Sequence, residues 1–208
     1  MDYFVSVTGD DFGPGSKEHP FKTISKAASL AVAGDSVTVG KGTYREWVKP
    51  ANGGSGEDKR IVYRAAKGEK VIIKGSEELK DWKNEGGSVW SASVPNSIFK
   101  GAASYGECNP FAKEVWGDWV VWPLEKPVHL GDLYLNGKSF YEAQSLEEVR
   151  KAEKRLTGYN PPWTKHEEAI LEPEKTVYQW FAEVGREETK IYANFHGFDP
   201  NKELVEIS

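Results

Sequence analysis

In the first 76 residues, short apolar runs alternate with polar or glycine-rich breaks, which is the pattern of a β-rich chain. Residues 3–7 alternate aromatic or branched side chains with smaller ones and predict a strand, whereas residues 40–44 predict a turn. Further strands are predicted at 35–39, 61–65 and 71–73. Strands of three to five residues joined by small turns are typical of a solenoid.

One helical pattern interrupts these strands. Pro20 stands at a position that suits the first turn of a helix. Apolar residues then recur at helical spacing from Phe21 to Ala31, and Gly34 ends the run. Because the first coil of a parallel β-helix exposes an apolar end that needs a cover, we interpret residues 20–33 as an N-terminal capping helix.

After residue 76 the alternating runs become longer, and seven of the eight tryptophans follow. Asn136 and Gly137 separate two short apolar runs and accept the positive φ angles of a type I′ turn, so they predict a tight antiparallel hairpin. A second hairpin is predicted around Gly185, between residues 177–184 and 189–195. These features indicate an antiparallel β-sandwich.

One surface helix is predicted within this part, because Ser145 and Glu148 form a capping-box pattern ahead of an apolar periodicity. The predicted fold class of the whole chain is all-β. Residues 1–76 are predicted to be the capped start of a right-handed parallel β-helix, and residues 77–200 the antiparallel β-sandwich. Residues 201–208 are predicted to be a strand that returns toward the β-helix.

Charge and composition narrow the range of partners. The formal net charge is -5, from 27 basic and 32 acidic residues spread along the chain, so there is no basic stripe that would neutralise phosphates. No stretch approaches the roughly 20 apolar residues that cross a bilayer, and the first residues lack the segments of a signal peptide. We therefore predict a cytoplasmic protein that binds neither nucleic acid nor membrane.

Metal and cofactor chemistry is not indicated either. Cys108 is the single cysteine, which excludes a disulfide within these residues and a zinc site built on paired cysteines. The four histidines stand far apart without ligand-like spacing. The sequence therefore predicts no metal site and no cofactor.

Carbohydrate binding is the chemistry that the aromatic content favours. Indole rings stack on the apolar faces of sugar rings, and their N–H groups can meet hydroxyls. Trp116 and Trp119 lie on either side of a predicted bend at Asp118, and Asn109 precedes them in a glycine- and serine-rich loop. We predict a substrate-binding site in which Trp119 is a stacking wall and Asp118 accepts hydrogen bonds from hydroxyls. Trp116 and Asn109 complete the predicted site.

Trp163, after Pro161 and Pro162, is a further exposed-loop candidate for a sugar-facing role, whereas three other tryptophans and two histidines are interpreted as structural. Trp82, Trp90 and Trp180 lie within alternating apolar patterns and are predicted to pack in the core. His129 and His196 are interpreted as hydrogen-bonded residues rather than as catalytic bases.

No catalytic residue is assigned, because no suitable carboxylate pair is found in the sequence. Retaining glycosidases need two carboxyl groups roughly 5 Å apart, and inverting enzymes need about 6.5 to 9.5 Å. Glu114 and Asp118 would share one face of a strand, but about 13 Å would separate their backbones. Asp10 and Asp11 lie among glycines and are interpreted as turn residues.

The first part also contains an ordered set of short motifs: Gly9-Asp10-Asp11, Pro20-Phe21-Lys22-Thr23-Ile24, Ala27-Ala28, Gly34-Asp35-Ser36-Val37 and Gly42-Thr43-Tyr44-Arg45-Glu46. This set resembles the N-terminal capping segment of right-handed parallel β-helix proteins that act on polysaccharides. Lyases, glycoside hydrolases and adhesins share that opening, so the resemblance implies a fold rather than a reaction.

Later segments narrow the resemblance: Asn109-Pro110-Phe111, Gly117-Asp118-Trp119, residues 129–139 and residues 194–201. Together they resemble glycoside hydrolase family 120, the β-xylosidases in which a β-sandwich is inserted into a parallel β-helix. The resemblance implies retaining hydrolysis of β-xylosides by two carboxylates, with a neutral xylo-oligosaccharide as the partner. In that family these carboxylates lie on coils that follow the sandwich, so they are expected beyond residue 208.

Whether the chain is itself an enzyme is left open by its residues. A non-catalytic carbohydrate-binding module would use the same tryptophans and would bind sugar without turnover. A structural or assembly segment would pair its open β-helix edge with a second copy and form a homo-oligomer. Binding, turnover and concentration-dependent association distinguish these alternatives.

Overall fold

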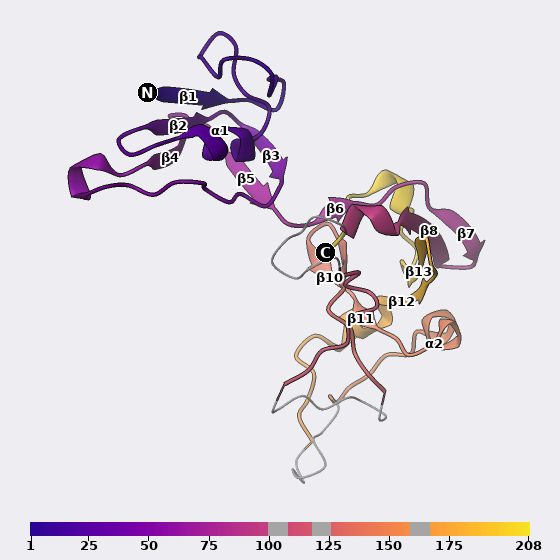
Figure 1. Ribbon diagram of the computed structural model, residues 1–208. Coiled ribbons are helices and arrows are strands. Elements are labelled where there is room, and N and C mark those ends of the chain that lie inside the picture. Colours follow the sequence, from indigo (N-terminus) through magenta and orange to yellow (C-terminus); the bar gives the residue numbers. More distant parts are fainter. Residues whose placement is uncertain (100–107, 118–125, 159–166) are drawn as a thin grey trace. The chain divides into compact units, whose positions relative to one another are not determined.

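Short strands make up most of the regular structure in the computed structural model of the chain (Figure 1). The all-β class is therefore confirmed. The chain divides into two compact units, Met1–Ser76 and Glu77–Ser208. The structure describes residues 1–99, 108–117, 126–158 and 167–208.

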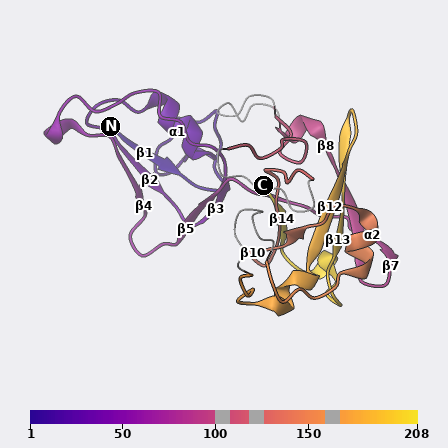
Figure 2. The ribbon, with the colours of Figure 1, turned by 90° about the horizontal axis from the view of Figure 1, so that it is seen from below.

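The strands of the first unit pair in parallel in two small sheets. One sheet has the order β1-β2-β4, and in the other β3 pairs with β5 (Figure 2). Because each successive strand of a sheet lies in register with the preceding one, side chains such as Tyr3, Val37 and Tyr63 stack in a row. The strands are β1 (Asp2–Val5), β2 (Ser36–Val39), β3 (Gly42–Arg45), β4 (Val62–Ala65) and β5 (Val71–Lys74).

Helix α1 (Ile24–Leu30) covers the core of this unit with small side chains. Ala27, Ala28 and Ala31 are fully buried, which lets the helix lie close to β1 and β2. The helix is shorter than the predicted range of 20–33. Phe21 is bridged to β1 instead, and Ala31 has an extended backbone. With seven residues, α1 is far too short to cross a bilayer, and no helix in the described ranges has the length and hydropathy to do so.

Two carboxylates hold the start of this helix. Asp11 accepts hydrogen bonds from the backbone N–H groups of Lys22 (2.8 Å) and Thr23 (2.9 Å), so its interpretation as a structural residue is confirmed. Glu46, just after β3, accepts from the N–H groups of Ile24 (2.8 Å) and Ser25 (2.7 Å). The first N–H groups of a helix have no partner within it, so Glu46 satisfies two of them, while Asp11 holds the two residues that precede the helix.

The prediction of a turn at residues 40–44 is wrong for most of that segment, because β3 begins at Gly42. A Cβ atom on Gly42 would approach Cγ1 of Val7 to 2.5 Å, so glycine allows the chain to pass there. Tyr44 points into the core and donates its hydroxyl to the carbonyl of Gly40 (2.9 Å). Glycine-rich local sequence favoured a turn, but pairing with β5 selects the extended conformation.

Tyr63 supplies a stability prediction for the first unit. Within the described residues its buried hydroxyl has no hydrogen-bond partner, and burial raises the pKa of the phenol. An unsatisfied buried polar group costs about 1–3 kcal/mol, so Tyr63→Phe is expected to leave the free energy of unfolding unchanged or slightly higher.

The matched control is Tyr44→Phe, which removes a hydroxyl that has a partner and should lower the free energy of unfolding by about 1 kcal/mol. Native-state hydrogen exchange of the β2 amides measures both variants within this unit. A larger loss for Tyr63→Phe than for Tyr44→Phe would contradict the prediction.

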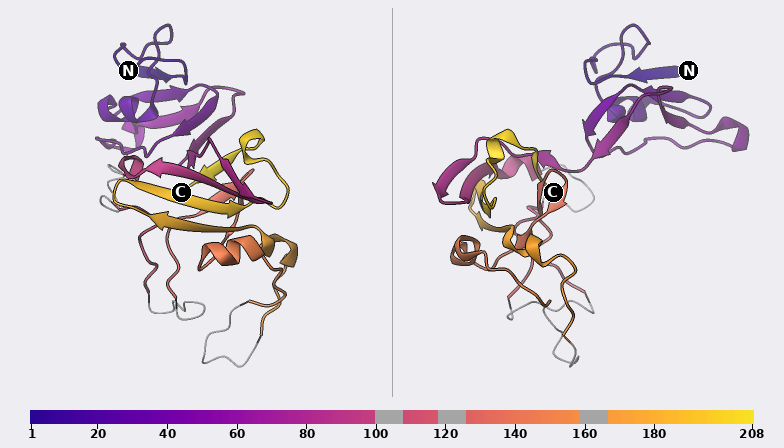
Figure 3. Two further views of the ribbon diagram at one scale, coloured as in Figure 1. Left: turned by 90° about the vertical axis from the view of Figure 1, so that its right-hand side faces the viewer. Right: turned by 180° about the vertical axis from the view of Figure 1, so that it is seen from behind.

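The second unit contains two sheets that share one core. The four-stranded sheet has the order β10-β9-β14-β6, and the five-stranded sheet has the order β11-β12-β13-β8-β7 (Figure 3). Leu133, Val205 and Ile207 of the first sheet pack in one cluster with Trp180 and Ile191 of the second. The strands are β6 (Glu77–Glu78), β7 (Lys83–Gly86), β8 (Val89–Pro95), β9 (Leu133–Leu135), β10 (Lys138–Ser139), β11 (Tyr141–Glu142), β12 (Gln179–Val184), β13 (Glu188–Asn194) and β14 (Val205–Ile207).

One strand pair departs from the predicted antiparallel arrangement. Strand β11 pairs with β12 in parallel, whereas the other pairs in both sheets of this unit are antiparallel within the described residues. The chain reaches β12 from β11 through helix α2 (Leu146–Lys151) and a long connection. Such a connection can carry the chain back to the same end of the sheet, which a hairpin cannot do.

Both predicted hairpins are confirmed. Asn136 and Gly137 have φ angles of 52° and 78°, as a type I′ turn requires, and they join β9 to β10. Strands β12 and β13 pair antiparallel around Gly185. Half of the predicted capping box is present, because the Ser145 hydroxyl accepts from the N–H of Glu148 at the start of α2, whereas the Glu148 carboxylate accepts from the N–H of Gln144. These elements depend on residues close together in sequence.

Strand β14 lies between β9 and β6 in the four-stranded sheet. It closes the core of the second unit through Val205 and Ile207, both 2% exposed. The return of residues 201–208 toward a β-helix stays a prediction. Within the described residues, the 3₁₀ turns are Glu57–Lys59, Asn96–Phe99, Pro173–Val177 and Pro200–Lys202.

Candidate functional site

A short antiparallel ladder on the second unit carries the exposed Trp116. Glu114 is bridged to His129, and the N–H of Val115 donates to the carbonyl of Val128 (2.9 Å). We call this ladder the stem; it consists of residues 113–116 and 127–130. Trp116 is 69% exposed, so the stem presents an indole ring to solvent.

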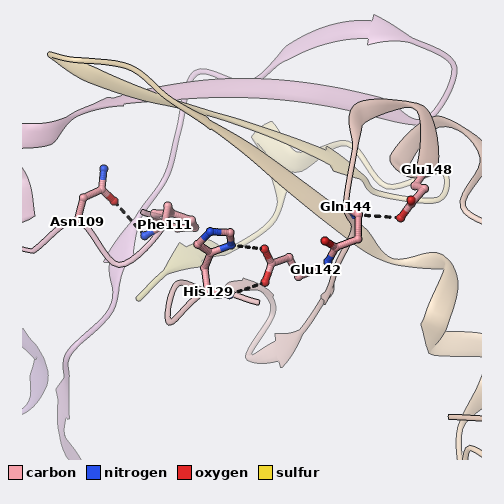
Figure 4. Close-up of polar contacts among 6 residues, drawn as sticks. All are labelled: Asn109, Phe111, His129, Glu142, Gln144 and Glu148. Carbon is pink, nitrogen blue, oxygen red and sulfur yellow. Dashed lines mark hydrogen bonds and ion pairs between the residues drawn. The ribbon is translucent and has the colours of Figure 1, made fainter. Parts of the chain in front are cut away.

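Asn109 ties the base of the stem to the sandwich. Its side-chain oxygen accepts from the N–H of Phe111 (3.0 Å), which forms a local turn (Figure 4). Its amide nitrogen contacts the Thr189 hydroxyl (2.7 Å) on β13 and the side-chain oxygen of Asn96 (3.2 Å). These contacts give Asn109 a structural role, and its predicted contact with substrate stays a prediction.

Phe111 is the hydrophobic anchor of the stem. Its ring is 2% exposed and lies edge-on to Trp180, with centroids 5.3 Å apart and an interplanar angle of 88°. A Cβ atom on Gly131 would approach the Phe111 ring to 2.7 Å, so glycine makes room for the ring. Burying this aromatic pair joins the start of the stem to the core of the sandwich.

His129 and Glu142 form a third connection. One oxygen of the Glu142 carboxylate lies 2.6 Å from Nδ1 of His129, and the other accepts from the backbone N–H of His129 (2.8 Å) (Figure 4). The side chains are 26% and 15% exposed. Glu142 lies on β11, opposite Trp180 in register. The interpretation of His129 as a hydrogen-bonded residue is confirmed.

The segment that follows Glu142 is also held in place. The N–H of Gln144 donates to the side chain of Glu148 on α2 (2.9 Å) (Figure 4). Val149 of the same helix is fully buried and packs with Val89 and Ala143. The strand that positions Glu142 is therefore fixed from both sides.

The structure describes two of the four predicted site residues. Trp116 is exposed on the stem and Asn109 lies at its base, whereas Asp118 and Trp119 lie outside the described residues, as does the further candidate Trp163. The contact between His129 and Glu142 was not predicted from the sequence, because no sequence pattern around either residue indicates that the two side chains meet.

Two of the three tryptophans predicted for the core lie in it, and the third, Trp90, is partly buried against it. Trp82 and Trp180 are 4% and 2% exposed, and Trp90 packs against the same cluster. Among the described residues, no three His, Cys, Asp or Glu side chains gather closely enough to hold a metal ion. The stem exposes the side chains of Lys113 and Trp116, and its Glu114 and His129 side chains are partly exposed.

The first unit is similar to proteins whose function is not known. Residues 7–51 match a family described as a protein of unknown function, DUF1565. The uncharacterized protein YwoF of Bacillus subtilis (strain 168) is 39% identical over 72 residues, which are 35% of this chain and 15% of YwoF. The DUF1565 match lies within Met1–Ser76.

The second unit matches a family of glycosidases. Residues 79–207 match the family described as glycoside hydrolase 120, insertion domain. A solved structure, described as the complex structure of XylC with xylose, is 49% identical with a TM-score of 0.89. That similarity covers 100% of this chain and 31% of the XylC chain, so the present chain spans less than a third of XylC. The chain belongs to glycoside hydrolase family 120 and contains the insertion domain of that family.

Proposed function

We propose that this chain is the N-terminal portion of a β-xylosidase that hydrolyses xylo-oligosaccharides with retention of configuration. The observation that carries the proposal is the similarity to XylC, which spans this whole chain at 49% identity. XylC was solved with xylose, which supports a neutral pentose as the sugar recognised. In this proposal, the two catalytic carboxylates are supplied by residues that follow position 208 in the longer protein.

The first unit is proposed to be the capped start of a right-handed parallel β-helix. Its in-register parallel pairs and the alanine-rich cover of α1 support this. Strands β4 and β5 are the outer strands of their sheets, so a further coil would pair with them in the longer protein. Without that coil, the same edges would pair two copies of the chain, and sedimentation at increasing concentration would detect a dimer.

The second unit is proposed to contribute a sugar subsite through the stem. Trp116 supplies an exposed indole ring there, and three separate connections hold the stem on the sandwich. Trp119 is proposed as the stacking wall and Asp118 as the acceptor for sugar hydroxyls. Pre-organised aromatic rings bind sugars at low entropic cost, since fewer side-chain rotations are lost on binding.

Trp119→Ala tests this subsite directly. Removing a stacking ring is expected to weaken xylobiose binding by about tenfold, measured by isothermal titration calorimetry. Trp47→Ala is the matched control, because it removes the same type of side chain from an exposed position (47%) in the first unit. Equal affinity of the Trp119 variant and the unmodified chain would refute the role of Trp119.

Hydrolysis of 4-nitrophenyl β-xyloside, measured on the same sample, shows whether residues 1–208 are catalytically active without the rest of the proposed enzyme. Binding of xylobiose without release of nitrophenol is expected, because the carboxylate pair is proposed to lie outside these residues. Turnover that a carboxylate substitution within residues 1–208 abolishes would place the active site inside the chain and overturn this part of the proposal.

A further inference from the structure

Glu114 and His129 lie on one face of the stem, and the spacing of Trp116 from Glu114 points to the same face. Glu114 and His129 are directly opposite each other in the antiparallel bridge, and residues opposed in this way point to one face. Trp116 follows Glu114 by two positions, and side chains two residues apart in an extended strand point the same way. The ladder therefore brings a carboxylate, an indole and an imidazole together.

The contact with Glu142 determines which nitrogen of His129 faces the ligand. A carboxylate accepts hydrogen bonds but does not donate them, so the short contact places the ring proton on Nδ1. In the neutral ring, Nε2 then carries a lone pair and acts as an acceptor. Because Glu142 also holds the backbone N–H of His129, the carboxylate fixes both the orientation and the tautomer of the imidazole.

We propose that Glu114, Trp116 and His129 form a subsite for a neutral pyranose, which deepens the proposed function and rests on it. Nε2 of His129 and the carboxylate of Glu114 accept hydrogen bonds from neighbouring hydroxyl groups of the sugar. The ring of Trp116 packs against the apolar face of the sugar. Glu142 does not touch the sugar and acts as a positioning residue through His129.

The side chains of Glu114, Trp116 and His129 match the chemical groups of a neutral pyranose. A pyranose such as xylose offers adjacent hydroxyl donors on its edge and C–H groups on its face, which match two acceptors beside an aromatic ring. The exposed fractions allow access, since Trp116 is 69% exposed and the His129 side chain is 26% exposed. The pairing with Glu142 lowers the entropic cost of binding, because the imidazole is already fixed.

Nitrogen NMR of the chain labelled with ¹⁵N-histidine tests the proposal without a mutation. The free chain should show His129 protonated at Nδ1, and xylobiose should shift the Nε2 resonance of His129 but leave that of the exposed His19 unchanged. In Glu142→Gln, the carboxylate charge is removed, so His129 should lose its Nδ1–H preference and xylobiose should bind more weakly. A purely structural role for Glu142 would not change the tautomer.

Binding measurements with His129 variants give a second readout. His129→Phe retains a planar ring but removes both nitrogens and should weaken xylobiose binding about three- to tenfold. His129→Gln places an amide near the position of Nε2 and should recover part of that loss. His19→Phe, a matched change in the first unit, should bind as the unmodified chain does.

The outcomes are distinguishable from failure of the proposed function. If xylobiose shifts resonances elsewhere in the second unit but leaves His129 unmoved, and His129→Phe binds normally, this inference is wrong while the proposed function stands. If xylobiose shifts no resonance and gives no heat of binding at millimolar concentration, the sugar subsite and this inference both fail.

Discussion

Trp180→Ala is expected to lower the free energy of unfolding of the second unit by about 4 kcal/mol. Trp180 is 2% exposed on β12 and packs edge-on against Phe111, so its removal leaves a large cavity at the centre of the core. The domain stability from which this loss is subtracted is only about 5–15 kcal/mol, so the variant should be near the limit of folding.

Urea denaturation followed by tryptophan fluorescence measures this effect, since seven of the eight tryptophans lie in the second unit. Trp116→Ala is the matched control: it removes the same side chain from a position that is 69% exposed. Its unfolding free energy should change by less than about 0.5 kcal/mol. Similar losses for both variants would show that Trp180 does not hold the core together.

Substitution of Trp180 should also weaken sugar binding at the candidate subsite. Phe111 anchors the base of the stem by packing on Trp180, and Glu142 lies opposite Trp180 in the sheet. Trp180→Phe is a more conservative variant that should still fold. We expect it to weaken xylobiose binding although its free energy of unfolding falls only slightly. The imidazole tautomer of His129 would report this coupling directly.

Glu46→Ala is expected to lower the free energy of unfolding of the first unit by about 3 kcal/mol. The carboxylate accepts from the N–H groups of Ile24 and Ser25 and from the Ser25 hydroxyl. Ile24 is 2% exposed, so its N–H group would be left buried without an acceptor. Hydrogen bonds to charged groups contribute about 1.5–3 kcal/mol each, and water replaces part of that in the variant.

Hydrogen exchange of the α1 amides measures this change within its own unit. Glu57→Ala is the control for the substitution itself, because Glu57 forms an exposed ion pair with Arg60 and its side chain is 85% exposed. That pair should contribute less than about 1 kcal/mol. Equal exchange rates in the two variants would mean that Glu46 does not stabilise the helix start.

Much of the second unit could be predicted because its signals are local. The turn at Asn136 and Gly137 depends on two residues that tolerate positive φ, and the helix start at Ser145 depends on a side chain three positions away. Trp82 and Trp180 lie within alternating apolar patterns of the sequence, which predicted their burial, and both are buried. In each case, the residues that determine the structure lie within a few positions of it.

The candidate site could be predicted only in part. The sequence predicted Trp116 as part of a sugar-binding site, and its side chain is 69% exposed in the structure. The hydrogen bond from Asn109 to Thr189 joins residues 80 positions apart, and the clamp of Glu142 on His129 joins residues 13 positions apart. Neither pairing leaves a trace in the local sequence, because each depends on which strands become neighbours.

The sequence by itself determined the all-β class, both hairpins and the capped helix α2, since short-range geometry and hydrophobic alternation encode them, and its motifs carried the resemblance to family 120. Tertiary structure alone decided that Gly42–Arg45 is a strand, that β11 runs parallel to β12, and that His129 faces Glu142. The physical reason is the same for all three. Their conformation is selected by hydrogen-bond partners supplied by distant segments, and those partners exist only once the sheets have formed.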